Sequence, residues 1–354
     1  MQTASGASEN AVENADPIWA AVDALIDSID DLPTLTANRM HLLAAKRWRE
    51  LGREVPAELE EAVRSAALGT LVVPLLLTRV RDVVTRPFVL HKGPEIAARY
   101  PDPALRFYTD LDLLVRDAHD AQRRLVDAGF VEVGDAARYV DGPHERPLVW
   151  PRYPLAIELH DRLNWPRWLG EPPTEELFGV AEPAATGVEG VLTLAPIHHA
   201  LVVAMHAWRH GPMSHIGHLV DVAVMADGLD ADELRVTARR WGLDGLWQTT
   251  SEVADAVLYG APEPWALRTW ARNLSTGRER TVLEAHLGWW LAGFSAVGAR
   301  RGLGVMGQQI ARNLVPADGE TWGAKLRRTR IALRNARTVK SDHDAELERA
   351  RSEL

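Results

Sequence analysis

Residues 105–115 read Leu-Arg-Phe-Tyr-Thr-Asp-Leu-Asp-Leu-Leu-Val, with two acids two positions apart in an apolar stretch. In a β-strand, residues i and i+2 point to the same face, so Asp110 and Asp112 would project together. Leu111 and Leu113 would lie on the opposite, buried face. Two neighbouring negative charges on an apolar strand are costly unless a positive group lies between them. The commonest such group is a divalent cation, usually Mg²⁺, which binds carboxylates together with a phosphate substrate.

An Asp-x-Asp pair alone is usually a surface feature, but three neighbouring features favour chemistry here. Residues 89–94, Val-Leu-His-Lys-Gly-Pro, indicate a short strand, a glycine turn and a helix with proline at its first position. Such a turn presents backbone donors and a helix N-terminus, which suit a phosphate. Lys92 and Arg106 bracket the turn and the acidic strand. Residues 155–160 form a later strand that offers a third carboxylate, Glu158.

Taken together, these residues resemble the uncharacterised nucleotidyltransferase family of bacteria, which belongs to the DNA polymerase β-like nucleotidyltransferase superfamily. The resemblance rests on Lys-Gly, a helix, Arg-x3-Asp-x-Asp-Leu-Leu-Val, a second helix with Ala-Gly-Phe, and finally Ile-Glu-Leu-His. It covers the stretch from Lys92 to His160 well and extends weakly through the helices that follow. The chain departs from the superfamily pattern at Pro94. Ser or Gly usually follows the first glycine of the turn, whereas proline supplies neither a hydroxyl nor an N–H.

The resemblance implies a metal-dependent nucleotidyltransferase. It would move a nucleoside monophosphate from a nucleoside triphosphate, such as ATP, to a hydroxyl or similar acceptor by two-metal phosphoryl transfer. Its catalytic and metal-binding residues would be Asp110, Asp112 and Glu158, with Mg²⁺ or Mn²⁺ as cofactor. The residues expected to bind the nucleotide are Lys92, Gly93, Arg106, His206, Arg209 and His210. A modified peptide, an antibiotic, a protein and a tRNA end are the candidate acceptors.

The main alternative is a catalytically inactive nucleotide-binding or regulatory protein on the same fold. Pro94 favours this alternative because it removes a donor from the phosphate turn. The intact set of acids favours the enzyme, since crowded carboxylates without a partner would otherwise lower stability with nothing to offset the loss. Mg²⁺-dependent binding of nucleoside triphosphates, followed or not by covalent transfer, distinguishes the two.

Composition and charge indicate an ordinary globular protein. The net charge of −9 argues weakly against a general nucleic-acid binder, and the absence of cysteine excludes disulfides and thiolate metal sites. No positive region followed by an apolar run is visible near residue 1, so no signal peptide is expected. The longest apolar run, residues 68–77, is too short to span a bilayer and contains Pro74. We therefore expect a cytoplasmic protein without a membrane partner.

The expected fold class is α+β, with a polymerase β-like core of mixed sheet and helices between N-terminal helices and a C-terminal helical domain. The expected divisions are a disordered tail 1–15, a helical segment 16–85, the core 86–165, a helical domain 166–320 and a charged C-terminal helix or tail 321–354. The expected strands are 88–91, 109–115, 130–133, 137–140, 148–150 and 155–160. The expected helices are 16–29, 36–51, 56–84, 94–99, 118–128, 196–209, 215–226, 230–241, 243–259, 264–273 and 279–291.

The histidines between 198 and 218 have several interpretations. His206 and His210 lie at i and i+4 on one helix face, which is zinc-ligand spacing, but the glutamate of the zinc-protease motif is absent. Asp221 or His215 could supply a third ligand. The resemblance instead implies that His206, Arg209 and His210 face the phosphates or base of the nucleotide. The remaining interpretation is a helix–helix contact in which Asp221 pairs a histidine.

Two further segments also have two interpretations each. Residues 164–173 are an irregular linker rich in Trp and Pro, for which packing against the rest of the protein is favoured over a wall of the nucleotide or acceptor pocket. Basic residues recur from 325 to 340 with no acid among them, before an acidic tail at 342–353. A solvated helix is favoured there over a dock for an acidic partner or RNA.

Overall fold

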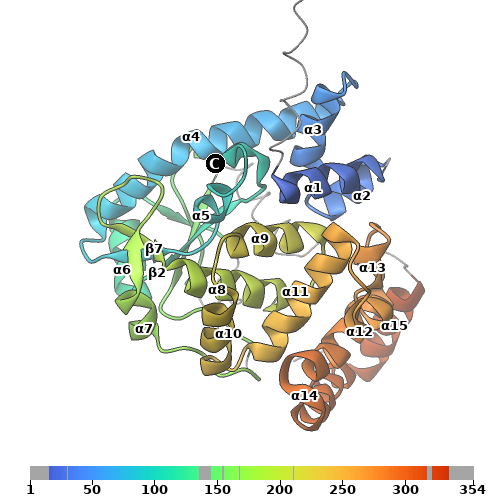
Figure 1. Ribbon diagram of the computed structural model, residues 1–354. Helices are drawn as coiled ribbons and strands as arrows, with labels where there is room; N and C mark the ends of the chain where they lie inside the picture. Colours follow the sequence, from blue (N-terminus) through green and yellow to red (C-terminus); the bar gives the residue numbers. More distant parts are fainter. Residues whose placement is uncertain are drawn as a thin grey trace, which may run out of the picture.

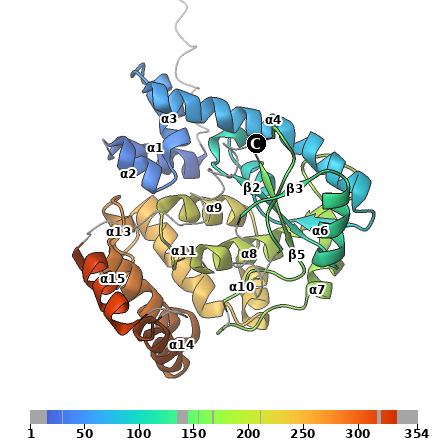
Figure 2. The ribbon, with the colours of Figure 1, turned by 180° about the vertical axis from the view of Figure 1, so that it is seen from behind.

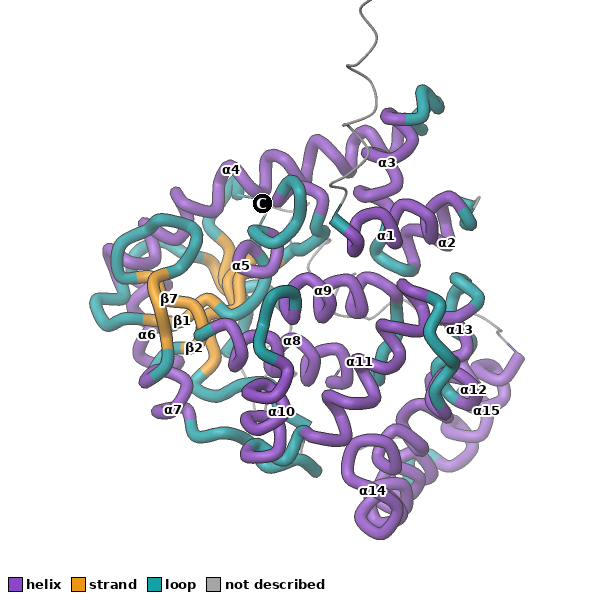
Figure 3. Tube along the Cα trace, viewed as in Figure 1, coloured by secondary structure: helices purple, strands orange, loops and turns teal. Residues whose placement is uncertain are grey.

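The computed structural model describes residues 16–29, 31–134, 145–153, 155–166, 168–209, 211–316 and 321–334. The expected tail 1–15, the expected strand 137–140 and the chain after residue 334 lie outside these ranges. Most of the described chain is helical, and the strands gather on one side of the molecule (Figure 3).

The core is a mixed sheet, which in the described residues has seven strands in the order β3-β4-β5-β2-β1-β7-β6. The strands are β1 Phe88–Leu90, β2 Asp110–Leu114, β3 Val131–Glu132, β4 Leu148–Val149, β5 Ala156–His160, β6 Ala181–Pro183 and β7 Val191–Leu194. Strand β2 runs parallel to β5 and antiparallel to β1, and β1 runs parallel to β7. The first five strands confirm the sequence prediction to within one or two residues.

Strands β6 and β7 were not predicted, and they extend the sheet with residues from the segment expected to begin the helical domain. Both are short, and the exposed β6 ends in Pro183, a residue confined to sheet edges. Neither strand shows the alternation that distinguishes a half-buried strand from a loop. Strand β7 pairs with β1 and β6 pairs with β7, so these partners have to be known before either strand can be recognised.

One face of the sheet is covered by two helices, α4 (Ala57–Val83) and α6 (Ala118–Asp127), as Figure 2 shows. Leu111 and Leu113 of β2 pack there in a core shared with α4 and α6. Burying each such leucine contributes about 1.5–3 kcal/mol. Because side chains alternate between the two faces of a strand, the two acids of β2 must lie on the opposite face.

That opposite face is turned toward the helical part of the chain. Helices α8 (Pro196–Arg209) and α9 (Ile216–Ala226) lie beside it, and α1 (Pro17–Asp27) lies beyond α9 (Figure 1). Val89 and Leu114 belong to the same apolar core as these helices. The acidic face of β2 therefore lies where the sheet, α8, α9 and the N-terminal helices meet.

The predicted single helix 36–51 is wrong. The structure has two helices, α2 (Leu32–Ala37) and α3 (His41–Glu50), which are separated by a bend at Asn38 and Arg39. Arg39 adopts a left-handed conformation with φ 56°, and the Met40 N–H donates to the Leu35 carbonyl at 2.8 Å. This is the hydrogen bond of a Schellman helix end, which usually has glycine at the left-handed position. Because this position holds arginine and not glycine, the end of the helix could not be recognised in the sequence.

The other helices follow the predictions with three differences. The remaining elements are α5 Pro94–Ala97, the 3-10 turn η1 Pro103–Leu105, α7 Thr174–Gly179, α10 Ala231–Arg240, α11 Asp244–Tyr259, α12 Trp265–Thr269, α13 Arg272–Ser275, α14 Val282–Leu314 and α15 Trp322–Arg334. Helix α7 was not predicted, the expected helix 264–273 is split into α12 and α13, and α14 continues well past the expected end at 291. Gly298, with φ 75°, kinks α14, and α14 and α15 lie far from the sheet (Figure 1).

The linker at residues 164–173 packs against the helical part of the protein. Trp165 is buried and meets the ring of Trp241 at 6.2 Å, which confirms the packing interpretation of the linker.

Among the described residues, α4 is long and apolar enough to cross a membrane by length and composition alone, with 28% of its most apolar window buried. A core helix of a soluble protein passes the same test, so the expected absence of a membrane partner stays a prediction.

Candidate functional site

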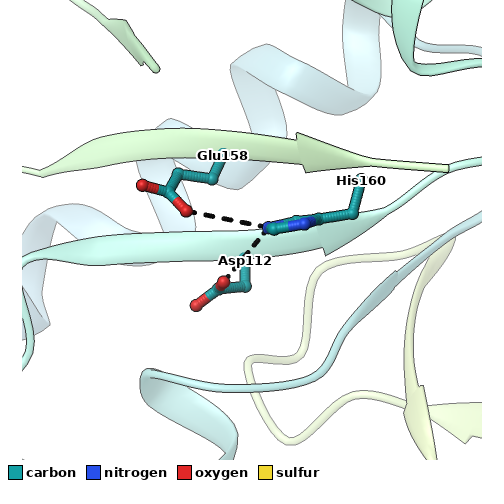
Figure 4. A group of neighbouring side chains, drawn as sticks. All are labelled: Asp112, Glu158 and His160. Atoms are coloured by element: carbon teal, nitrogen blue, oxygen red, sulfur yellow. Dashed lines mark hydrogen bonds and ion pairs between the residues drawn. The ribbon is translucent and has the colours of Figure 1, made fainter. Parts of the chain in front are cut away.

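Strands β2 and β5 bring four polar side chains to one face of the sheet. Their parallel register places Asp112 directly opposite Glu158. Asp110 lies two residues before Asp112 and His160 two residues after Glu158, so all four side chains share that face. Asp112, Glu158 and His160 are buried. Figure 4 shows the carboxylates of Glu158 and Asp112 at the same end of the His160 ring, 3.8 and 3.2 Å from its Nε2.

Asp112 contacts two positively charged or polar side chains. The Lys92 Nζ lies 2.7 Å from its Oδ1, and His160 Nε2 lies 3.2 Å from the same oxygen. Burial alone would raise the pKa of Asp112, but Lys92 and His160 outweigh burial and hold the pKa well below its usual range. Asp112 is therefore a carboxylate at neutral pH, and Lys92 is its counterion.

Asp110 has the opposite character. Its side chain is only partly buried, and it makes no hydrogen bond or ion pair with the described residues. Burial, followed by repulsion from Asp112 and Glu158, raises the pKa of Asp110 to about 7. A carboxylate held among other carboxylates with no partner of its own gains most from an added cation.

Asp112, Glu158 and His160 could hold a metal ion, because one ligand atom from each lies within 4.8 Å of the other two. The donor set fits a divalent cation, since it combines two carboxylate oxygens with an imidazole nitrogen. The expected set was Asp110, Asp112 and Glu158. Sequence reasoning missed His160, although its position two residues after Glu158 on a strand already placed it on the same face.

Two further histidines lie beside the acids on this side of the sheet. The His91 ring meets the His160 ring edge-on at a centroid distance of 5.7 Å. The backbone N–H of His91 donates to the backbone carbonyl of Asp112 at 3.3 Å. His199 of α8 reaches the His91 carbonyl at 2.9 Å through Nε2. Burial lowers the pKa of His199 to about 4 and that of His91 well below its usual range. Both rings are therefore neutral parts of the scaffold at neutral pH.

The turn before α5 is built on a glycine. Gly93 has φ 59°, and a Cβ there would lie 3.1 Å from the Asp110 carbonyl. Glycine is therefore required for the turn to approach β2 closely. Helix α5 has only four residues and begins with Pro94, so its N-terminus offers few free amides. Phosphate binding by Gly93 stays a prediction.

Arg106, expected to bind the nucleotide, lies in a buried ion pair. Its Nε and Nη2 donate to the two oxygens of Asp221 at 2.8 and 2.9 Å, and its Nη1 donates to the Gly93 carbonyl at 3.2 Å. Tyr100 donates its hydroxyl to Asp221 at 2.7 Å. Asp221 therefore binds Arg106 and Tyr100, and not a histidine as one of the alternative interpretations had it. The ion pair joins the glycine turn to α9.

Tyr100→Phe should destabilise the protein by about 1–2 kcal/mol, because it removes a buried hydrogen bond to a charged carboxylate and keeps the ring in place. The ring packs against Trp19 at a centroid distance of 5.0 Å, and phenylalanine preserves that contact. Thermal and denaturant midpoints measure the loss. Tyr153→Phe is the matched control, since the Tyr153 hydroxyl makes no hydrogen bond with the described residues. Equal midpoints for Tyr100→Phe and the wild type would show that the Asp221 network contributes nothing.

The histidines of α8 and α9 form a separate cluster. The rings of His206 and His218 are 5.9 Å apart, and those of His215 and His218 are 3.5 Å apart. Arg209 contacts Asn164 of the linker through its Nε. His210 lies outside the described residues. In the described part of the chain, the cluster is not among the groups of three that could hold a metal, and nucleotide binding by His206 and Arg209 stays a prediction.

Comparison with known proteins gives one match. A family described as an uncharacterised nucleotidyltransferase matches residues 32–258, well over half of the chain. This stretch contains the whole sheet, α8, α9 and the bend between α2 and α3. No curated protein and no solved structure matches the chain.

Proposed function

Because the chain belongs to the uncharacterised nucleotidyltransferase family, we propose that it transfers a nucleoside monophosphate from a nucleoside triphosphate to a hydroxyl acceptor. The acceptor oxygen attacks the α-phosphorus, a new P–O bond forms, and the bond to the β-phosphate breaks to release pyrophosphate. The observation that carries the proposal is the register of β2 and β5, which sets Asp112 opposite Glu158 with His160 beside them. The core is proposed to have the polymerase β-like arrangement.

The roles of the side chains follow from their environments. Asp110, Asp112 and Glu158, with His160, would hold Mg²⁺ or Mn²⁺. When bound, the cation would neutralise charge on the triphosphate and on the leaving pyrophosphate. Glu158 would take the proton of the acceptor hydroxyl as the new bond forms. Lys92, which neutralises Asp112, keeps the acids of the site from repelling one another.

The acceptor is proposed to be a peptide, a small molecule such as an antibiotic, a protein or a tRNA end, and the protein is proposed to act in the cytoplasm. A direct test is covalent transfer from each of the four α-³²P-labelled nucleoside triphosphates into a cell extract, with Mg²⁺ or Mn²⁺ present. We expect one nucleotide to label an acceptor, and we expect EDTA to remove the labelling. Glu158→Gln, which keeps the size of the side chain, is the matched negative control. Labelling that survives EDTA or Glu158→Gln would contradict the proposed site.

A further inference from the structure

Arg39 occupies an unusual backbone position. It is the left-handed residue that ends α2, with φ 56°, where glycine is the usual choice. A side chain in this conformation costs about 1–2 kcal/mol relative to glycine. Such a residue persists where its surroundings hold it in place, and it often marks a functional position.

The bend is held by α9. The Asn38 side chain accepts a hydrogen bond from the Ile216 N–H at 3.2 Å, and the Asn38 carbonyl accepts one from the Gly217 N–H at 3.0 Å. A Cβ on Gly217 would lie 3.1 Å from the Cβ of Arg39, so the two chains touch. The same helix is joined to the glycine turn through the ion pair between Asp221 and Arg106. Helix α9 is therefore bonded directly to the Arg39 bend and, through the ion pair of Asp221 with Arg106, to the turn before α5.

The Arg39 bend also lies near the strand that carries the acids. The ring of His41, two residues after Arg39, meets the ring of Phe107 edge-on at 5.3 Å, and Phe107 lies three residues before Asp110. Burial lowers the pKa of His215, and the positive charge of Arg39 lowers it further, which agrees with the contact between the Arg39 bend and the start of α9.

The other two cations of the site are already engaged. Lys92 is bound to Asp112, and all the donor-bearing nitrogens of Arg106 are used by Asp221 and the Gly93 carbonyl. The Arg39 side chain is exposed and makes no hydrogen bond or ion pair with the residues that the structure describes. A triphosphate needs cationic donors, and binding it through Lys92 or Arg106 would first break a buried ion pair. Binding it through Arg39 requires no such loss.

We propose that Arg39 binds the triphosphate of the nucleotide, across the site from the acids of β2 and β5. The inference rests on the proposed function, and it assigns a substrate contact to the N-terminal helices. A guanidinium suits this role because its planar donors bind phosphate oxygens in pairs. The left-handed backbone and its attachment to α9 aim the side chain before substrate arrives.

The test is equilibrium binding of Mg²⁺-tripolyphosphate, which needs neither the correct base nor the acceptor. Isothermal calorimetry would compare the wild type with Arg39→Gln, Arg39→Lys and a matched control. We expect Arg39→Gln to weaken binding by about tenfold to a hundredfold, which is the usual contribution of one charge-assisted contact. Arg39→Lys should retain part of the affinity. Arg152→Gln is the control, because Arg152 is also exposed and left-handed, with φ 71°, and should bind as the wild type does.

Two results would overturn the assignment. One is unchanged tripolyphosphate binding by Arg39→Gln, and the other is a wild-type protein that does not bind tripolyphosphate. Either could occur while labelled nucleotide is still transferred, in which case the proposed function stands and the role of Arg39 falls. Conversely, Arg39-dependent binding of tripolyphosphate without transfer from any nucleotide would support the anion site and contradict the proposed reaction.

Discussion

Asp112→Asn is expected to abolish nucleotide transfer and to destabilise the metal-free protein by roughly 2–4 kcal/mol. Asparagine has nearly the same shape, but it removes the counterion of Lys92, whose side chain is only 12% exposed. It also removes the charged acceptor of His160. The buried ammonium would then lose the carboxylate that lies 2.7 Å from its Nζ. Thermal and denaturant midpoints in EDTA would measure the loss of stability.

The pH dependence of this loss follows from the pKa of Asp112. The pKa is held well below its usual range in the folded protein, so the charge of Asp112 contributes stability at any pH above about 4. As the pH falls further, the folded wild type takes up the proton and loses that contribution. The difference in stability between Asp112→Asn and the wild type should therefore be full at neutral pH and shrink under acid.

Lys92→Met provides the control for this interpretation. If the ion pair causes the loss, the double variant Lys92→Met with Asp112→Asn should be more stable than Asp112→Asn alone, because it leaves no buried ammonium without a counterion. Additive losses would mean that Lys92 and Asp112 act independently. Transfer should remain absent in the double variant, since the acid itself is missing.

The acidic strand could be predicted from the sequence because every step there is local. Period-2 alternation places Asp110 and Asp112 on one face, and the leucines between them identify the other face as buried. The same rule applied to β5 also places His160 beside Glu158. The sequence therefore contains the signal that identifies His160 as a member of the site.

The partners of the arginines could not be predicted in this way. Arg106 and Asp221 are 115 positions apart, and only the packing of α9 beside the glycine turn brings them together. Arg39 lies in a bend that reads as helix, because arginine favours helices and glycine is absent. Both arginines show that a positive charge near a motif does not reveal whether its partner is a substrate or an acid of the protein.

The edge of the sheet was missed for a related reason. Strand β7 gains its hydrogen bonds from β1, a strand about a hundred positions earlier, and β6 pairs with β7, so the local sequence of both strands carries little signal. The helices α8 to α11 were found because amphipathic periodicity is a property of the segment itself. Local patterns therefore positioned the acids, whereas long-range pairing determined which charges surround them.

Asp110→Asn is expected to abolish transfer and to stabilise the metal-free protein, so activity and stability should change in opposite directions. Asp110 has a pKa of about 7 in the folded protein, against about 4 in the unfolded chain. Between these values the folded state keeps a proton that the unfolded state has lost, so wild-type stability falls as the pH rises.

Asparagine carries no such proton, and the stability of the variant should not show this fall. The difference in thermal midpoint between variant and wild type should be near zero below about pH 4, grow as the pH rises, and level off above about 7. The corresponding difference in the free energy of unfolding is at most about 4 kcal/mol, and it is smaller because Asp110 is partly exposed to water. At neutral pH, Asp110→Asn and Asp112→Asn thus differ from the wild type with opposite signs. The Asp110 difference develops between about pH 4 and 7, whereas the Asp112 difference changes only below about pH 4. An Asp110→Asn protein that is less stable than the wild type at pH 8, or that still transfers nucleotide, would show that Asp110 is a structural residue whose charge the fold requires.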